Sequence, residues 1–283
     1  MPFLVGTSGW QYRDWRGRFY PPRLPQRLWL EHHCARWQTV ELNNSFYRLP
    51  AREVFEAWRA RTPSDYVVTV KASRYLTHIK RLREPEEPVA RLMERATGLG
   101  DRLGPVLVQL PPDLQLEAER LDRTLSFFPP GTRLVVEPRH PSWWVPELRE
   151  VLSRQGAALC WADRGSEPVA PLWRTAGWGY LRLHAGGGED VWPYDEAVLA
   201  RWADLLCETW SDDEDVFVYT NNDPGGAALR DGVTLARLLR DRGRTVGRVP
   251  DWDEVTGELY VPQRGGARAV AAPVEAVGSP PVG

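Results

Sequence analysis

The feature that most constrains the fold is a repeated alternation of short apolar runs with helical stretches. Eight runs of β-favouring residues occur, and helical periodicity follows most of them. The runs are Phe3–Ser8, Thr39–Asn43, Tyr66–Lys71, Pro105–Leu110, Leu134–Val136, Ala158–Asp163, Gly179–His184 and Asp215–Asn221. Strands that alternate with helices pair in parallel through right-handed crossovers. Eight such units over about 245 residues predict an α/β fold of the (β/α)8 TIM-barrel type.

A doubly wound open sheet is the alternative architecture. No GxGxxG motif follows the first run, as it would in a dinucleotide-binding sheet of that kind. The alternation ends at Gly247, and the remaining residues are rich in Pro, Gly, Ala and Val. We therefore expect a single barrel domain, residues 1–247, and a loosely attached or disordered tail, residues 248–283.

Net charge and cysteine content indicate the cellular compartment and the partners of the protein. The net charge of −2 gives no overall basic surface for nucleic acid. Three cysteines without CxxC spacing suit a reducing compartment. The N-terminus lacks the pattern of a signal peptide, and no apolar run approaches the roughly 18 residues of a membrane span. These features predict a cytoplasmic protein without a membrane partner.

Polar side chains recur where the apolar runs end. Side chains alternate along a strand, so one face of each strand is expected to bring polar groups to the carboxyl end of the sheet, where barrel active sites lie. These groups are Glu41, Asn43, Lys71, Gln109, Glu137, Arg139, Asp163, Arg182, His184, Tyr219 and Asn221. Three acids oppose three bases among them and could simply neutralise one another. Because buried ion pairs add little stability, we favour a functional ring.

The residue types suggest acid/base chemistry on a small anionic substrate. Glu41 and Glu137 are the candidate base and acid, and His184 is placed in the same catalytic group. Arg139 and Arg182 would stabilise negative charge. Lys71, the fourth catalytic candidate, either pairs with a carboxylate or, with a lowered pKa, forms a Schiff base. The remaining predicted substrate contacts are Ser8, Trp10, Tyr12, Tyr47, His78, His140, Trp143 and Asn222.

Two glycine-containing loops suggest an anion site. Residues 186–188 follow the seventh run, and residues 221–226 follow the eighth and lead into a helix. Barrel phosphate sites commonly use these two loops, because glycines let backbone N–H groups approach a ligand. Both segments could equally be ordinary turns.

Metal binding is a weaker alternative. His78, His140 and His184 could meet Glu41, Glu137 and Asp163 in a ligand set that suits Zn²⁺ or Mn²⁺. No HExxH or similar spacing supports such a site, so we predict no cofactor and no metal ligand, with a divalent metal left open. A metal-assisted phosphodiesterase or nuclease that contacts nucleic acid is the second function, and a non-catalytic binding protein is the third.

An ordered series of motifs resembles a known family, the domain-of-unknown-function 72 family. The motifs are Gly6–Trp10 with Tyr12, Trp15 and Phe19–Pro21, then Val40–Tyr47, Lys71 with Thr77–His78, Gln109–Pro112, Glu137–His140 with Trp143, Arg182–His184, and Tyr219 with Asn221–Asp223. Thr220 and Ala185 depart from the family pattern. The resemblance implies a TIM barrel and no established activity. The prediction is therefore a barrel enzyme that uses acid/base chemistry on a small polar anionic substrate. That substrate carries a phosphate or a carboxylate, and a sugar-like compound would fit.

Overall fold

The strands of the computed structural model form one curled, ten-stranded sheet in a mixed α/β fold. The structure describes residues 3–184 and 193–255. The strands are β1 Phe3–Thr7, β2 Thr39–Leu42, β3 Val67–Lys71, β4 Leu103–Gln109, β5 Leu134–Glu137, β6 Ala158–Leu159, β7 Trp161–Arg164, β8 Glu167–Pro168, β9 Gly179–Leu183 and β10 Val216–Thr220. Their order is β6-β5-β4-β3-β2-β1-β10-β9-β7-β8, and among the described strand pairs only β7–β8 is antiparallel.

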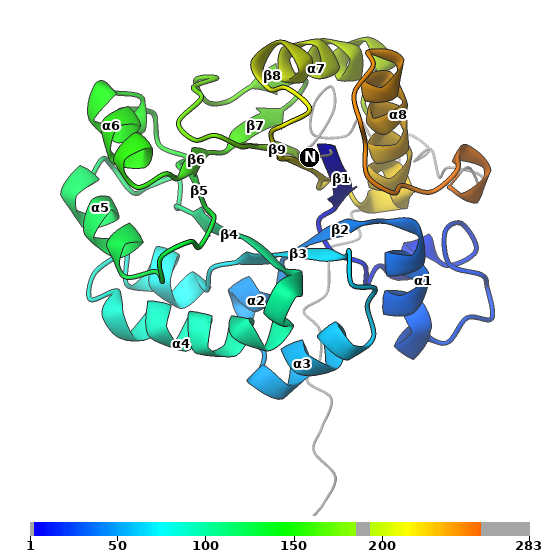
Figure 1. The fold of residues 1–283 in the computed structure, drawn as a ribbon, viewed down its shortest axis with the longest axis horizontal. Coiled ribbons are helices and arrows are strands. Elements are labelled where there is room, and N and C mark those ends of the chain that lie inside the picture. The colour runs from blue at the N-terminus through cyan, green and yellow to red at the C-terminus, as the bar shows by residue number, and fades with distance from the viewer. Residues whose placement is uncertain (1–2, 185–192, 256–283) are drawn as a thin grey trace, which may run out of the picture.

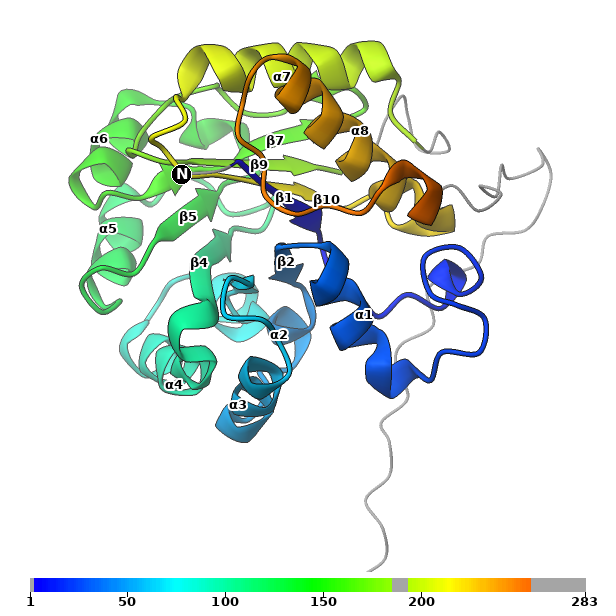
Figure 2. The ribbon, with the colours of Figure 1, turned by 45° about the vertical axis from the view of Figure 1, so that its right-hand side comes forward.

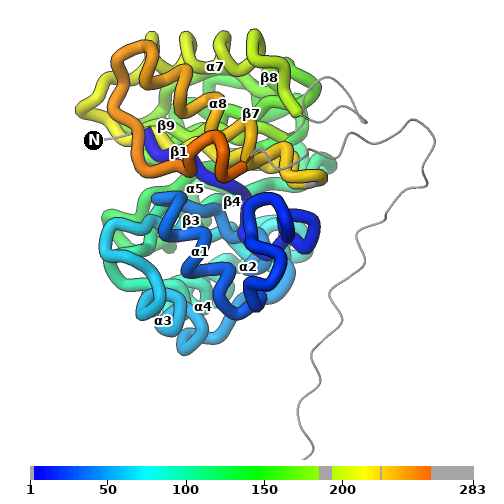
Figure 3. The backbone as a smooth tube through the Cα atoms, turned by 90° about the vertical axis from the view of Figure 1, so that its right-hand side faces the viewer, coloured from blue at the N-terminus to red at the C-terminus, as the bar shows by residue number. Residues whose placement is uncertain are grey.

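Helices surround the sheet on its outer side (Figure 1). They are α1 Trp29–Arg36, α2 Asn44–Tyr47, α3 Arg52–Ala60, α4 Glu86–Ala96, α5 Ala118–Ser126, α6 Pro146–Arg154, α7 Glu196–Thr209 and α8 Ala227–Asp241. Short helical turns lie at 13–15 (η1), 26–28 (η2), 75–79 (η3), 97–102 (η4), 141–143 (η5), 224–226 (η6) and 252–254 (η7). After a turn of 45°, α1, α3 and α4 lie on one side of the strands and α7 and α8 on the other (Figure 2). The tube view separates the same two groups (Figure 3).

Alternating side chains create two apolar layers, one on each face of the sheet. On β10, Val216 and Val218 join the large outer core beneath the helices, whereas Phe217 and Tyr219 join a smaller cluster on the inner face. The inner cluster also contains residues of β1, β4, β5, β6, β7 and β9. Polar side chains on this inner face therefore stand farther along the strands, at the carboxyl end of the sheet.

The predicted strands are found with small shifts at their ends, and one is divided. The sixth run forms β6 and β7, which are separated by Cys160 alone. β6 pairs with β5, and β7 pairs with β9. The short β7–β8 hairpin was not predicted, and it turns at Gly165 and Ser166, both at positive φ.

The C-terminal boundary of the packed body lies beyond the predicted residue 247. The Gln38 N–H donates to the Arg248 carbonyl at 3.0 Å, and Val255 is buried. The segment 248–255 therefore packs against the body, which corrects the prediction that a loose tail begins at 248. The rest of that predicted tail, 256–283, lies outside the described residues. Among the described helices, none is both long enough and apolar enough to cross a bilayer.

Candidate functional site

Polar side chains meet on the inner face of the sheet at the carboxyl ends of its strands. Gln109, Glu137 and Arg182 each stand two residues beyond a member of the inner apolar cluster, so alternation points them to the same face. We call the following set the ring: Glu41 from β2, Lys71 from β3, Gln109 from β4, Glu137 from β5, Arg182 from β9, and Arg139, His184 and Asn221 just beyond β5, β9 and β10.

Arg182 lies at the centre of the ring and bridges the two glutamates. Its Nη2 is 2.8 Å from Glu41 Oε1, and its Nη1 is 2.5 Å from Glu137 Oε2. All three side chains are almost completely buried. Ser8 donates to Glu41 at 2.7 Å, and Gln109 donates to Glu137 at 2.9 Å. The two carboxylates are thus held in place by donors from several strands.

These contacts determine how the two carboxylates titrate. Burial is the largest influence on Glu41 and would raise its pKa, but the Arg182 charge, the Tyr180 and Ser8 hydrogen bonds and the Lys71 charge together leave that pKa below its ordinary value. Burial also opposes ionisation of Glu137, yet Arg182, His184 and Arg139 hold its pKa well below the usual range. Both groups are therefore carboxylates at neutral pH, and neither has the raised pKa of a general acid.

A layer of hydroxyl groups closes the inner space below the ring. The Tyr180 hydroxyl donates to Glu41 Oε2 at 2.5 Å. The Tyr219 hydroxyl lies 2.6 Å from Thr39 Oγ1 and 2.8 Å from Thr69 Oγ1. Tyr219 is completely buried, so it belongs to this floor and not to the substrate contacts where it was predicted. Tyr180 was missed, although it stands two residues before Arg182 and alternation would have found it.

Asn221 and Arg182 contact the two ring nitrogens of His184. Asn43 Nδ2 lies 3.4 Å from the Ser8 carbonyl oxygen and 3.4 Å from Asn221 Oδ1, so Asn221 turns its Nδ2 toward His184. That Nδ2 donates to His184 Nδ1 at 2.9 Å, and Arg182 Nη1 lies 3.3 Å from His184 Nε2. Nε2 lies 3.6 Å from Glu137 Oε1. Burial, followed by the Arg182 charge, lowers the pKa of His184, so the imidazole is neutral at neutral pH.

Lys71 and Arg139 supply the cations that are not enclosed by carboxylates. Arg139 donates to Glu137 Oε1 at 3.1 Å while its side chain stays 29% exposed. Lys71 is 8% exposed, and its Nζ lies 4.4 Å from the centroid of the Phe46 ring. Within the described part of the chain, this Nζ has no hydrogen bond and no ion pair. The expected pairing of Lys71 with a ring carboxylate is therefore wrong.

Asp163 and Asn222 were predicted to contact the substrate, and both lie elsewhere. Asp163 accepts hydrogen bonds from Tyr194 at 2.6 Å and from Trp202 of α7 at 2.8 Å, so it faces the helix layer. Asn222 is fully buried and donates to Asp231 at 2.7 Å. These contacts remove both residues from the predicted substrate contacts.

Most of the aromatic residues that were predicted to line a substrate pocket lie elsewhere. Trp10 is buried in edge contact with Trp58 of α3, at 5.3 Å between ring centroids. Trp143 is fully buried and donates from Nε1 to a main-chain carbonyl. Tyr47 is 79% exposed, and Tyr12 donates to the Ser8 carbonyl. Phe46, whose ring lies beside Lys71 Nζ, was not predicted.

The other two histidines that were predicted to contact substrate are bonded to their neighbours. His78 Nδ1 is 2.9 Å from Thr77 Oγ1, and His140 Nδ1 is 2.8 Å from Ser142 Oγ. Burial lowers the pKa of His78 to about 4, with Lys71 as the next cause. In the described residues, no three His, Cys, Asp or Glu side chains gather where they could hold a metal ion.

Of the two predicted anion loops, the structure describes residues 221–226. Residues 186–188 lie outside the described residues. In the loop 221–226, the Gly225 N–H donates to the Asp14 carboxylate at 2.8 Å, so a carboxylate of the chain already occupies this donor. Sequence reasoning also missed Asp223 in this loop. Burial raises the pKa of Asp223 to about 8, and its Oδ1 is buried without a hydrogen-bond partner in the described structure.

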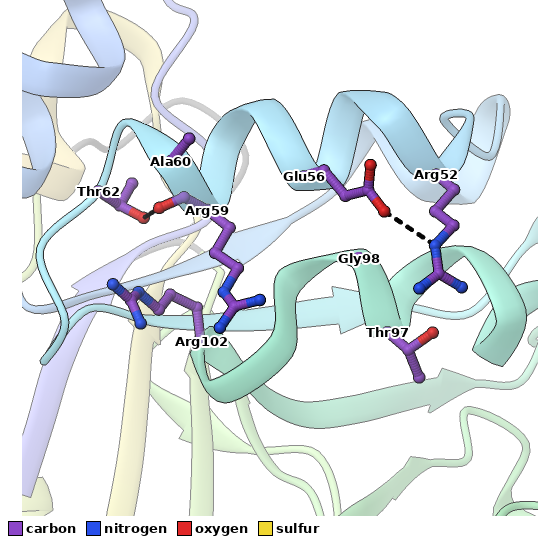
Figure 4. Close-up of a pocket in the computed structure, with 8 residues that line it drawn as sticks. All are labelled: Arg52, Glu56, Arg59, Ala60, Thr62, Thr97, Gly98 and Arg102. Carbon is purple, nitrogen blue, oxygen red and sulfur yellow. Dashed lines mark hydrogen bonds and ion pairs between the residues drawn. The ribbon is translucent and has the colours of Figure 1, made fainter.

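A cavity of about 520 Å³ lies away from the ring, between α3 and η4 (Figure 4). Its lining includes Arg52, Arg59 and Arg102. Arg52 pairs with Glu56 on the same helix, and both side chains are about half exposed. Exposed pairs of this kind are ordinary surface chemistry, so volume alone does not make this cavity the functional site.

Comparison with known proteins places the chain in a family. The model described as "Protein of unknown function DUF72" matches residues 4–254. The chain belongs to the DUF72 family. The UPF0759 protein YunF of Bacillus subtilis (strain 168) is 25% identical, and the match covers 83% of this chain and 94% of that protein. The UPF0759 protein YecE of Escherichia coli (strain K12) is 30% identical over 44% of this chain and 47% of its own length.

Solved structures of DUF72 proteins share the fold. A DUF72 family protein from Thermotoga maritima MSB8 has a TM-score of 0.75 and 27% identity, and the match covers 85% of this chain and 100% of that chain. One from Enterococcus faecalis V583 has a TM-score of 0.72 and 17% identity, with 84% and 95% covered. At that identity the second likeness supports the fold alone.

Proposed function

We propose that this DUF72 protein is an enzyme that transfers protons on a small anionic substrate held at the open side of the ring. The observation that carries the proposal is the charge of the ring. Arg139, Arg182 and Lys71 are three cations, and Glu41 and Glu137 are two anions, so one positive charge remains. The two cations with least carboxylate contact, Lys71 and Arg139, would attract a carboxylate or phosphate.

The proposal assigns proton transfer to His184 and positioning to the glutamates. The imidazole of His184 is neutral at neutral pH, and its Nε2 lies 3.6 Å from Glu137 Oε1, an arrangement suited to general acid/base work. Glu41 and Glu137 position Arg182, because hydrogen-bond donors of the protein occupy both carboxylates and the pKa of each carboxyl is lowered. Asn43 Oδ1 is buried without a partner in the described residues, so it can accept from a substrate hydroxyl.

Thermal unfolding with a panel of small anions tests binding first. The panel contains phosphate, glycolate, succinate and glyoxylate. At a concentration about 100 times its Kd, a ligand adds about 2.7 kcal/mol of stability, which is several degrees in a domain of this size. We expect at least one anion to stabilise the wild type and Arg237→Met, a control at an exposed pair on α8, and to stabilise Arg139→Met less. If no anion acts, or if Arg139→Met responds like the wild type, the proposed site is wrong.

Turnover of the stabilising compounds then tests catalysis. His184→Gln should bind the anion within about tenfold and lose roughly 10²-fold or more in kcat, the scale of one acid/base group. Full turnover by this variant would exclude His184. Binding without turnover in the wild type would favour a non-catalytic binding protein.

We also propose that the sheet closes into a (β/α)8 barrel. The support is the position of Cys160, which joins β6 at one side of the sheet to β7 near the other. β6 and β7 read together are one bent strand, which pairs with β5 through its first half and β9 through its second. A closed parallel arrangement places the ring at the end where barrel enzymes carry their active sites.

A further inference from the structure

Lys71 combines burial with the absence of a partner. It is 8% exposed, and its Nζ lies 4.4 Å from the centroid of the Phe46 ring. Every other cation of the ring reaches a carboxylate, whereas no carboxylate lies within ion-pair distance of Lys71 Nζ in the described residues. A buried amine without a counter-ion is unfavourable as an ammonium, so a role in stability does not account for it.

The choice of lysine at this position is itself informative. The sequence contains 34 Arg and only two Lys, Lys71 and Lys80. Arginine binds anions and cannot be deprotonated in a protein, whereas lysine can lose its proton and react. A site that only needed positive charge here would be served by the residue that the chain uses almost everywhere else.

Burial, more than the surrounding charges, shifts Lys71 toward the free amine. Burial is the main cause that lowers the pKa of Lys71, to about 8, and Arg182 of β9 is the second. Arg139, just beyond β5, acts in the same direction, while Glu41 of β2 and Glu137 of β5 oppose it. His78 of η3 also lies close enough to interact, and it is uncharged at neutral pH because its own pKa is lowered to about 4.

We propose that Lys71 is a nucleophile that forms a Schiff base with the carbonyl group of a small 2-oxo acid or aldehyde acid. The inference rests on the proposed function, because Arg139 would hold the acid group of the same substrate. Nζ adds to the carbonyl carbon and gives a carbinolamine. The carbonyl oxygen then leaves as water with both amine hydrogens, and a C=N bond replaces C=O. No electrons are gained or lost, so no further reactant is required.

Reductive trapping tests the proposal on the intact protein. The probes are acetaldehyde, which has no charge, and glyoxylate, which carries a carboxylate. Sodium cyanoborohydride reduces any imine that forms, and mass spectrometry of peptides measures the rate at each lysine. Lys80 is an internal control, since it is paired with Glu84, which raises its pKa. Lys71→Arg and Lys80→Arg confirm the assignment of the labelled peptides.

We expect acetaldehyde to label Lys71 at least tenfold faster than Lys80 at pH 7. About a tenth of the Lys71 amine is unprotonated there, against well under a thousandth of an amine with an ordinary pKa of about 10.4. The rate at Lys71 should rise with pH and level off above pH 8, while the rate at Lys80 keeps rising. Labelling of Lys71 that is no faster than that of Lys80 with either probe would overturn the Schiff-base proposal.

Comparison of the two probes separates this inference from the proposed function. If both are right, the ratio of glyoxylate to acetaldehyde labelling is at least severalfold higher at Lys71 than at Lys80, and Arg139→Met lowers it. Fast labelling of Lys71 without that preference would leave the nucleophile intact and contradict the anion site. Stabilisation by glyoxylate without labelling of Lys71 would support the anion site and overturn the Schiff base.

Discussion

Replacement of Arg182 by Met should destabilise the protein in a pH-dependent way. Arg182→Met keeps a long apolar stem and removes the charge between Glu41 and Glu137. Arg139 still contacts Glu137, but Glu41 loses its only ion-pair partner among the described residues. Because Glu41 is fully buried, its carboxylate becomes an uncompensated charge.

The cost can be estimated from the two ways in which the variant can respond. Breaking a buried pair costs about 3–5 kcal/mol when the remaining charge stays ionised. Protonation offers another route, at about 1.36 kcal/mol per pH unit above the ordinary pKa of 4.5. For one carboxyl this is about 3.4 kcal/mol at pH 7 and about 0.7 kcal/mol at pH 5. We therefore expect a loss of about 3 kcal/mol at pH 7 and about 1 kcal/mol at pH 5.

The sign of the pH dependence follows from the pKa of Glu41. In the wild type this pKa is lowered, so its contribution to stability is present above pH 4.5 and is lost as the pH falls through the folded-state pKa. In Arg182→Met, the largest of the influences that oppose burial is removed, so the pKa of Glu41 rises. The variant then loses stability as the pH rises above 4.5, and the difference from the wild type widens.

Urea unfolding followed by circular dichroism at pH 5 and pH 7 measures both losses. Urea is preferred because guanidinium chloride would screen the charges. Arg237→Met, at an exposed pair, should cost less than about 1 kcal/mol at either pH. If Arg182→Met does not fold at pH 7, the double variant Glu41→Gln with Arg182→Met should recover folding. An equal loss at both pH values, or no recovery, would refute the reasoning.

Three further changes test other parts of the structure by urea unfolding. Gly6→Ala would place a Cβ against the Thr39 carbonyl oxygen between β1 and β2, so it should cost about 1–3 kcal/mol, and an unchanged midpoint would mean that the strands lie farther apart. Tyr180→Phe removes a donor to a carboxylate and should cost about 1.5–3 kcal/mol at pH 7 and less near pH 4; a loss independent of pH would count against that bond. A chain that ends at residue 247 should be about 2 kcal/mol less stable than one that ends at residue 255, which keeps buried Val255, and equal stability would show that this segment adds nothing.

Much of the fold follows from local patterns in the sequence. The apolar runs coincide with strands because their side chains are buried on both faces, under the helices and inside the curl. The division of the sixth strand at Cys160 has no such signal, because residues 158–162 read as one continuous apolar run. The β7–β8 hairpin depends on a two-residue turn with positive φ at Ser166, a residue type that seldom predicts one.

The site was predictable where alternation alone decides direction. Alternation groups Glu41, Lys71 and Glu137 on the inner face, and the structure places them there, although their catalytic roles remain predictions. The same rule was applied wrongly to Asp163. Alternation puts its side chain on the same face as Leu159 and Trp161, which face the helices. Trp143 could not have been assigned, because its burial depends on a hydrogen bond to Leu114, which is distant in sequence.

The hydroxyl floor below the ring has a consequence for how ligands arrive. Tyr219, Thr39 and Thr69 satisfy one another, and apolar side chains fill the space beneath them. Water can therefore screen the ring charges from the open side only, while the low-dielectric side directs their field outward. Lys71 and Arg139 thus act over a longer range than two exposed cations would. The rate at which the protein binds an anion should therefore fall as ionic strength rises, even where the final contacts are too buried for salt to weaken them.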